Sequence, residues 1–314
     1  MTRIDAAAAA RRGWRMALAP LERLSEGRAW GYALLVPSLV LVLAVVLYPT
    51  LWGMVLSVRE MRLNRIDLGT GFVGLRHYAD LLDDPIFWLS LKNTVIWVVG
   101  AVVGELALGL AAALVLNRDL PGFKLLGVLV LLPWFLPNVV AGHMWALMLD
   151  PRLGVINDLL VQAGVLGAYR AWFADPGAAL FAVLMVEIWH GFPFFALLML
   201  AGLKAIPADL YEAASIDGAR ARQKFWFVTL PQLKMIIVAT VILRVISLVN
   251  SPDILLILTG GGPGRATQVL SLYAFIKANK EFNFGYASVI SVVMFVLLMA
   301  FAYLYVKLSN TMRE

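Results

Sequence analysis

The chain has 314 residues, of which 61% are hydrophobic and 15% are charged, and its formal net charge is +6. Soluble domains are about 45–50% apolar and about 25% charged, so this composition excludes an ordinary soluble domain and indicates a helical membrane protein. There is no cysteine, which excludes disulfides, thiol catalysis and cysteine metal sites. The positive charge is better explained by basic residues that flank membrane helices than by nucleic-acid binding.

The N-terminal segment, residues 1–29, is rich in arginine and precedes the first apolar run. That run is longer than the core of a signal peptide, and no small-residue cleavage site follows it. We therefore predict a cytoplasmic N-terminal tail followed by a first helix that is retained in the membrane.

Six apolar segments are long enough to cross a hydrocarbon core of ~30 Å as helices. Their approximate limits are 31–55, 91–116, 125–149, 178–200, 235–258 and 286–307. Lysine and arginine are more frequent in the connections that a cytoplasmic N-terminus would place inside the cell. The sequence thus predicts an all-α integral membrane protein with six transmembrane helices, both termini in the cytoplasm, and one transmembrane domain over residues 30–314.

The outer connections contain short amphipathic segments. Residues 77–88 and 157–165 each predict a short helix near the membrane surface, where Phe87 and Trp88 suit the interfacial aromatic belt. In the third apolar segment, Asn138 stands next to Pro137, which indicates a kink.

A polar loop over residues 203–233 separates the fourth and fifth apolar segments. Pro207 and Asp209 favour the start of a helix, Gly218 favours its end, and Pro231 marks the entry to the next span. The pattern predicts two short helices with a bend between them, outside the lipid.

The residue types in this loop are suited to contact with a partner. Ala213, Ala214 and Gly218 are small and permit close approach, and Glu212 offers a carboxylate to a basic residue on the opposing surface. The candidate apolar anchors are Tyr211, Phe225 and Trp226. A loop folded against its own helices would explain the apolar positions equally well without a partner.

The loop resembles the EAA loop of ATP-binding-cassette import permeases, which reads Glu-Ala-Ala, three residues, Gly, and later Leu-Pro. The matching residues are Glu212, Ala213, Ala214, Gly218, Val228, Leu230 and Pro231. Asp217 and Ala219 match the carbohydrate-importer version of this loop. Residues 258–288 are similar to the corresponding part of the first permease subunit of maltose-type carbohydrate importers, and the resemblance extends from about residue 30 to the end.

This resemblance implies a MetI-like permease core whose polar loop is a coupling helix that docks on a separate ATPase subunit. It implies a charged contact for Glu212 and a tight bend at Gly218. The residues assigned to ATPase coupling are Glu212, Ala213, Ala214, Asp217, Gly218, Phe225 and Pro231.

The resemblance also implies the composition of the assembly. The expected partners are a second homologous permease, two ATP-binding subunits that hold ATP and Mg, and an extracytoplasmic solute-binding protein, all at the lipid bilayer of a bacterial cell membrane. This chain would then be a non-catalytic subunit without a cofactor of its own.

The motifs of catalysis are missing from the sequence. It has no G-x-x-x-x-G-K-[ST] motif, because Arg265 and Ala266 follow the glycine-rich stretch 260–264 where Lys and Ser/Thr are required. That stretch instead predicts a turn with positive φ angles. The three histidines, His77, His143 and His190, do not have the spacing of metal ligands.

Polar residues inside the spans are costly and usually face a cavity or a partner. In the fifth span, Pro252 opens the helix, and broken helices at this depth often build transporter sites. In the fourth span, a carboxylate, an imidazole and an aromatic ring would suit the hydroxyls and ring face of a sugar. The candidate solute-pathway residues are Asn250, Ser251, Asp253, Glu187, Trp189 and His190.

These residues have a second interpretation, as buried polar pairs that join the spans. Arg244 suits either Glu105 or Glu187 as its partner, and the sequence does not choose between them. We predict a permease subunit that imports a carbohydrate, either a sugar or a glycerol-phosphate-like solute, with ATP as the energy source. The alternative is an ion-gradient-driven secondary transporter that uses the intramembrane carboxylates as proton sites.

Overall fold

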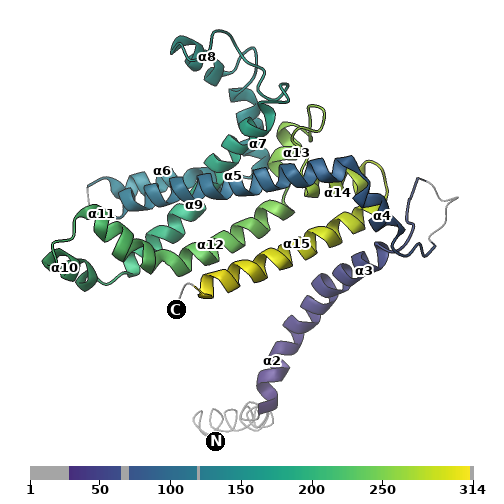
Figure 1. Ribbon diagram of the computed structural model, residues 1–314, viewed down its shortest axis with the longest axis horizontal. Helices are drawn as coiled ribbons and strands as arrows, with labels where there is room; N and C mark the ends of the chain where they lie inside the picture. Colours follow the sequence, from purple (N-terminus) through teal and green to yellow (C-terminus); the bar gives the residue numbers. More distant parts are fainter. Residues whose placement is uncertain (1–27, 65–70, 119–120, 312–314) are drawn as a thin grey trace, which may run out of the picture. The chain divides into compact units, whose positions relative to one another are not determined.

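The computed structural model describes residues 28–64, 71–118 and 121–311, and all regular elements within these ranges are helices (Figure 1). The N-terminal tail expected over residues 1–29 lies outside the described residues, apart from the last two, which already belong to the first helix.

The first span is one continuous helical segment that forms a unit of its own. It consists of α2 (Arg28–Leu41), a π-helical stretch (Val42–Leu47) and α3 (Tyr48–Leu56). None of the residues in its most apolar stretch is buried. A helix that is apolar on all sides is suited to lipid or to the surface of another protein.

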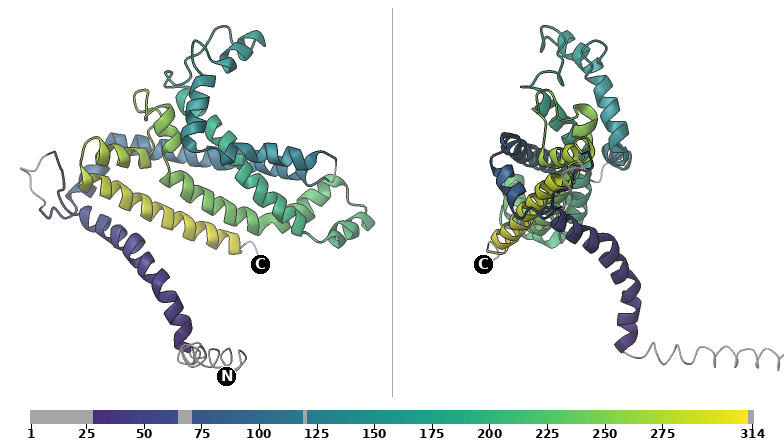
Figure 2. Two further views of the ribbon diagram at one scale, coloured as in Figure 1. Left: turned by 180° about the vertical axis from the view of Figure 1, so that it is seen from behind. Right: turned by 90° about the vertical axis from the view of Figure 1, so that its right-hand side faces the viewer.

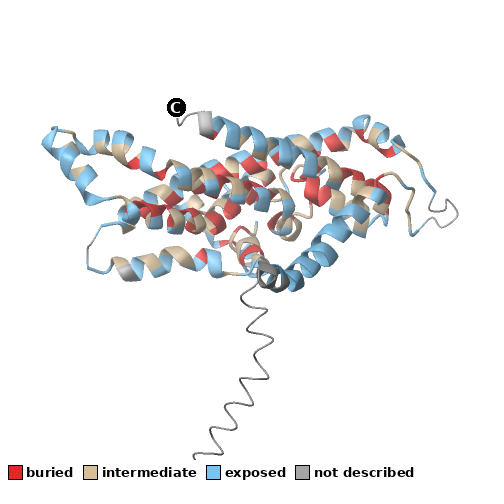
Figure 3. Cartoon of the chain, turned by 90° about the horizontal axis from the view of Figure 1, so that it is seen from below, coloured by how far each residue is buried: buried red, intermediate tan, exposed pale blue. Residues whose placement is uncertain are grey.

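The second unit begins at Ser57 and is built around four long helices that lie side by side (Figures 1 and 2). They are α5 (Pro85–Leu116), α9 (Ala179–Ala205), α12 (Leu230–Asn250) and α15 (Phe284–Thr311). Figure 3 shows the buried residues in the interior of this bundle and exposed residues around it. The largest fully buried side chain is that of Trp97, and Phe195 and Leu255 are also fully buried.

Glycines on α5 allow a close approach to α9. A Cβ atom at Gly109 would lie 2.9 Å from both the Phe192 carbonyl oxygen and the Ala196 backbone nitrogen. Small residues at helix contacts are the usual means of tight packing in membranes, where backbones gain van der Waals contact without a hydrophobic driving force.

The third apolar segment differs from the single span predicted over residues 125–149. It forms two helices, α6 (Phe123–Phe135) and α7 (Asn138–Met148), and the axes bend by 96° between them. Pro137 disfavours the helical conformation in the residue before it, and Leu136 is extended with a ψ of 130°. The expected kink at Asn138 is therefore a complete break.

The fifth apolar segment is interrupted where the sequence predicts it. α12 ends at Asn250, Ser251 is extended, and the short helix α13 (Asp253–Leu258) begins after Pro252. The following glycine-rich turn has the expected positive φ angles, with values of 59° at Gly260 and 94° at Gly261.

The connections predicted to lie outside the cell contain α4 (Arg76–Leu82), α8 (Val155–Gln162) and α14 (Leu270–Asn279). The helix expected over residues 77–88 is shorter than predicted, because Asp84 caps the next helix. Its Oδ1 accepts a hydrogen bond of 2.8 Å from the Ile86 amide, and Pro85 occupies the first turn. Phe87 and Trp88 consequently belong to the second span.

Among the described residues, five helices are long and apolar enough to cross a membrane, or six if the bent α6–α7 pair counts as one span. The polar loop forms α10 (Ala208–Ile216) and α11 (Ala221–Lys224). This loop lies at one end of the bundle, whereas α4 and α14 lie at the opposite end (Figures 1 and 2). The prediction of a multi-span helical membrane protein is confirmed.

Candidate functional site

The polar loop is a compact helical hairpin. α10 begins after Pro207 and ends at a bend where Gly218 has a φ of 76°. At the start of α11, the Arg220 amide donates a hydrogen bond of 2.8 Å to the Gln223 side chain. A π-helical stretch (Phe225–Thr229) then leads directly into α12.

Two side-chain contacts hold the hairpin closed. The hydroxyls of Tyr211 and Thr229 lie 3.0 Å apart, and Thr229 is buried. Lys224 donates from Nζ to the Ser215 hydroxyl at 2.5 Å. Tyr211, a candidate partner anchor in the sequence, therefore packs within the loop itself.

Other residues of the hairpin remain exposed. Glu212, Ala213, Asp217, Gly218 and Pro231 are exposed, whereas Ala214 and Phe225 are half-buried. Ile216 is 87% exposed, although it is strongly apolar. An exposed apolar residue beside a carboxylate and small residues makes this surface suitable for contact with another protein.

A polar cavity of about 360 Å³ lies where the α6–α7 break meets α9 and α12. Its lining combines charged, amide, hydroxyl, imidazole and aromatic groups. The lining residues are Trp134, Leu136, Pro137, Asn138, Glu187, His190, Arg244, Ser247, Leu248, Ser251 and Ile254. We call this cavity the polar pocket.

An ion triad forms one wall of the polar pocket. Arg244 donates from Nε and Nη2 to the two carboxylate oxygens of Glu105, both at 2.6 Å, and from Nη2 to Glu187 at 2.5 Å. Glu105 is fully buried. The two pairings left open by the sequence therefore both occur, and they join α5, α9 and α12. Buried charges of this kind are tolerated when they are paired in this way.

Gly191 on α9 makes room for the triad. A Cβ atom at this position would collide with the Glu105 carboxylate and the Arg244 guanidinium. Since Glu187 lies one helical turn before Gly191, the same face of α9 supplies both a ligand of the guanidinium and the space that it occupies.

The two helix breaks are bound to each other and to α9 by side chains. His190 donates from Nε2 to the Leu136 carbonyl oxygen at 2.9 Å, which satisfies a backbone group next to the break. Asp253 Oδ2 accepts hydrogen bonds from Asn138 at 3.0 Å and from Ser251 at 2.8 Å. The irregular backbone thus lines a cavity.

The structure brings only some of the candidate pathway residues together. Glu187, His190 and Ser251 line the polar pocket, and Asp253 is bound to two lining residues. Trp189 lies elsewhere: it contacts Trp145, with ring centroids 5.3 Å apart, in a separate apolar cavity.

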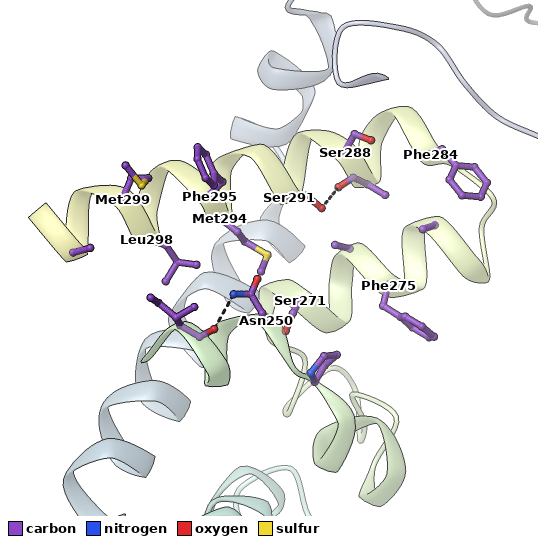
Figure 4. A pocket seen from close by; sticks show the side chains of 16 residues that line it. Asn250, Ser271, Phe275, Phe284, Ser288, Ser291, Met294, Phe295, Leu298 and Met299 are labelled. Carbon is purple, nitrogen blue, oxygen red and sulfur yellow. Dashed lines mark hydrogen bonds between the residues drawn. The ribbon is translucent and has the colours of Figure 1, made fainter. Parts of the chain in front are cut away.

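Asn250 also lies outside the polar pocket. It lines a second cavity of about 620 Å³ formed by α12, α14 and α15, where its side chain donates to the Ile246 carbonyl oxygen at 2.8 Å (Figure 4). The helix break separates Asn250 from Ser251. Asn250 is the last residue of α12, whereas Ser251 is extended and its hydroxyl binds Asp253.

The lining residues that were not predicted as pathway residues include the aromatic Trp134 and three polar residues, Asn138, Arg244 and Ser247. Arg244 could have been predicted from the sequence, since an arginine within an apolar span requires a carboxylate partner. For Asn138 the indication in the sequence is weaker, namely a polar residue beside Pro137. Ser247 is indistinguishable by sequence from any serine of a membrane helix.

The family described as "Binding-protein-dependent transport system inner membrane component" matches residues 105–313. The chain belongs to this family. It is 39% identical over 284 residues to the trehalose/maltose transport system permease protein MalF of Thermococcus litoralis, covering 90% of this chain and 95% of that protein. It is 36% identical to the sulfoquinovosyl glycerol transport system permease protein SmoG of Agrobacterium fabrum, covering 88% of this chain and 89% of that protein.

The fold is also similar to that of a solved structure. A chain of a bacterial ABC transporter involved in the import of the acidic polysaccharide alginate matches with a TM-score of 0.79 and 19% identity, covering 94% of this chain and 100% of that chain. The predicted MetI-like permease fold and the resemblance to ABC importer permeases are confirmed. The secondary-transporter alternative is rejected, because the family transports in dependence on a binding protein.

Proposed function

We propose that this chain is the permease subunit of an ATP-driven importer that moves a carbohydrate into the cytoplasm. The proposal rests on one structural relationship. The exposed hairpin connects α9, which carries Glu187 and His190, directly to α12, which carries Arg244. A force on the hairpin therefore acts on both helices that line the polar pocket.

The hairpin would receive this force from an ATP-binding subunit. Glu212 would pair with a basic residue of that subunit, and Ile216 would insert into an apolar depression beside it. The remaining contacts would come from Ala213, Ala214, Asp217, Gly218, Phe225 and Pro231. ATP and Mg would be bound by the partner, and this chain would remain non-catalytic.

The polar pocket supports a carbohydrate as the solute. Its lining includes hydrogen-bond donors and acceptors and the aromatic side chain of Trp134. A sugar has hydroxyls that both donate and accept and an apolar ring face that packs on aromatic rings. The names of the relatives, which include trehalose, maltose and sulfoquinovosyl glycerol transport, also refer to carbohydrates, two of them uncharged and the third sulfonated.

The complete importer would contain a second homologous permease, two ATP-binding subunits and an extracytoplasmic binding protein. Both termini and the hairpin would lie in the cytoplasm of a bacterial-type cell. Closure of the ATP-binding pair would move the two permeases as rigid bodies and reorient the pathway, as alternating access requires.

The test is Glu212→Lys in the complex purified with its ATP-binding subunits and reconstituted with the binding protein. Membrane insertion should be retained, because Glu212 is exposed. Uptake and binding-protein-stimulated ATPase activity should be lost. Asp209→Lys, in the first turn of the same helix, is the matched control for added charge. Full stimulated ATPase activity in Glu212→Lys would disprove the coupling role.

A further inference from the structure

The charges around the polar pocket are unequal in number. Glu187 and Arg244 line the cavity directly, Glu105 binds Arg244, and Asp253 binds the lining residues Asn138 and Ser251. Three carboxylates are therefore connected to the cavity. Among the described lining residues and the side chains bound to them, Arg244 is the only lysine or arginine.

The guanidinium group of Arg244 is already bound to carboxylates of the protein. Its Nε and Nη2 atoms donate to Glu105 and Glu187 at distances of 2.5 to 2.6 Å, and its side chain is 12% exposed. A paired arginine of this kind does not present a free bidentate fork to a phosphate, sulfonate or carboxylate. An anionic solute would have to displace a protein carboxylate that is held in place by the helix bundle.

The carboxylates retain capacity to accept hydrogen bonds. Asp253 receives both of its side-chain bonds on Oδ2, and Glu187 receives its bond from Arg244 on Oε1. A carboxylate has about four acceptor positions. Neutral donors and acceptors are close by in Asn138, Ser247 and Ser251. Such a lining satisfies hydroxyl groups, which donate to carboxylates, and repels a second negative charge.

We propose that the polar pocket selects uncharged polyhydroxylated solutes and excludes phosphorylated, sulfonated and uronic ones. This inference rests on the proposed function and narrows it, because it removes the glycerol-phosphate-like solute from the expected class. It also separates the chain from two similar proteins whose names refer to anionic solutes: the permease for sulfoquinovosyl glycerol, a sulfonated sugar, and the transporter of alginate, an acidic polysaccharide.

The lack of native cysteine allows a direct measurement of the charge in the pocket. Ser247→Cys is introduced into the assembled transporter in lipid nanodiscs. The thiol is then treated with cationic trimethylammonioethyl, anionic sulfonatoethyl or uncharged hydroxyethyl methanethiosulfonate, with and without ATP. Modification of this chain is followed by intact mass. Val165→Cys, at a site that is 67% exposed, gives the reference rates.

The ratio of the cationic to the anionic reaction rate is the readout. In the Ser247→Cys variant this ratio should exceed the ratio measured in the Val165→Cys variant by at least about tenfold. Adding Glu187→Gln, which leaves the bidentate Arg244–Glu105 pair in place, should reduce this preference severalfold. Adding Glu281→Gln removes a carboxylate that pairs with Lys277 outside the pocket and should leave the preference unchanged.

The possible outcomes distinguish the proposed charge selection from the proposed transport function. A cationic-to-anionic ratio in Ser247→Cys that is equal to or lower than the ratio in Val165→Cys would overturn the charge selection and leave the transport function intact. Failure of even the uncharged reagent to react in either nucleotide state would overturn the assignment of the pocket to the solute pathway. As a second measurement, the solute released from the denatured binding protein and shown to be imported should carry no negative charge by mass spectrometry; an anionic one contradicts the inference.

Discussion

Arg244 on α12 donates two hydrogen bonds of 2.6 Å to the carboxylate of Glu105 on α5, a residue 139 positions earlier in the chain. The pair is buried among helices that also pack through a shared apolar core. It therefore fixes the rotation of α12 relative to α5, because only one orientation of each helix brings the two groups together.

Glu105→Ala should destabilise the protein strongly. It leaves Arg244 buried with Glu187 alone, and breaking a buried ion pair by removal of one partner typically costs about 3–5 kcal/mol. The measurement is the thermal unfolding midpoint of the purified protein in detergent. Glu281→Ala, which breaks the exposed pair with Lys277, should shift the midpoint by far less, at about 0–1 kcal/mol. Equal shifts for the two variants would contradict a structural role of the triad.

Gly191→Ala should destabilise the protein, although it adds only one methyl group. The added methyl group collides with the Glu105 carboxylate and the Arg244 guanidinium, so the triad must separate or α9 must move. Overpacking of this kind costs about 1–3 kcal/mol. The control is Gly127→Ala on α6, where the new methyl group would meet only Leu116, at 3.9 Å.

The two alanine variants should differ in sign as well as in size. Gly127→Ala should be neutral or stabilising by up to about 1 kcal/mol, because alanine favours the helix. Thermal unfolding and solute uptake are measured for both. Wild-type uptake and stability in Gly191→Ala would show that the triad tolerates displacement.

Gly218→Val should weaken the hairpin, because a φ of 76° is unfavourable for a β-branched residue. Gly218→Asn should retain most of the activity, since asparagine adopts this conformation more readily than other side chains. Stimulated ATPase activity of the complex is the measurement. Indistinguishable losses in the two variants would indicate that space, and not backbone conformation, is what the glycine provides.

Asp84 should stabilise the end of the bundle that carries α4 and α14 in a pH-dependent manner. Burial favours its protonated form, but hydrogen bonds from Tyr273 and Tyr286, the Ile86 amide and the nearby Lys277 outweigh this effect and lower the pKa of Asp84. A lowered pKa in the folded state means that the stabilisation is present above the unfolded value of about 4 and is lost as the pH falls through the folded pKa.

The stability difference between wild type and Asp84→Asn should therefore be constant near neutral pH and should shrink below about pH 4. Thermal unfolding between neutral and acidic pH measures it. Asp83→Asn, at the exposed neighbouring position, is the control. A stability difference that stays constant down to the lowest pH would show that the hydrogen bonds do not depend on the ionised carboxylate.

Local sequence determined a large part of this protein. Apolar segments of membrane length predicted the spans, and Pro252 and Gly218 predicted the break and the bend that the structure contains. The spacing of Glu212, Ala213, Ala214 and Gly218 identified the loop. These properties depend on neighbouring residues, because helix length, proline geometry and positive φ angles are decided within a few positions of the chain.

The composition of the polar pocket was decided only by the tertiary structure. The sequence offered Glu105 and Glu187 as alternative partners of Arg244, whereas the packed helices bring both to it. It grouped Trp189 with His190, and the rotation of α9 places these neighbours in separate cavities. The 96° break after Phe135 is what brings Asn138 to Asp253. Such contacts depend on the rotation and crossing of helices that are distant in the chain, and no local pattern encodes them.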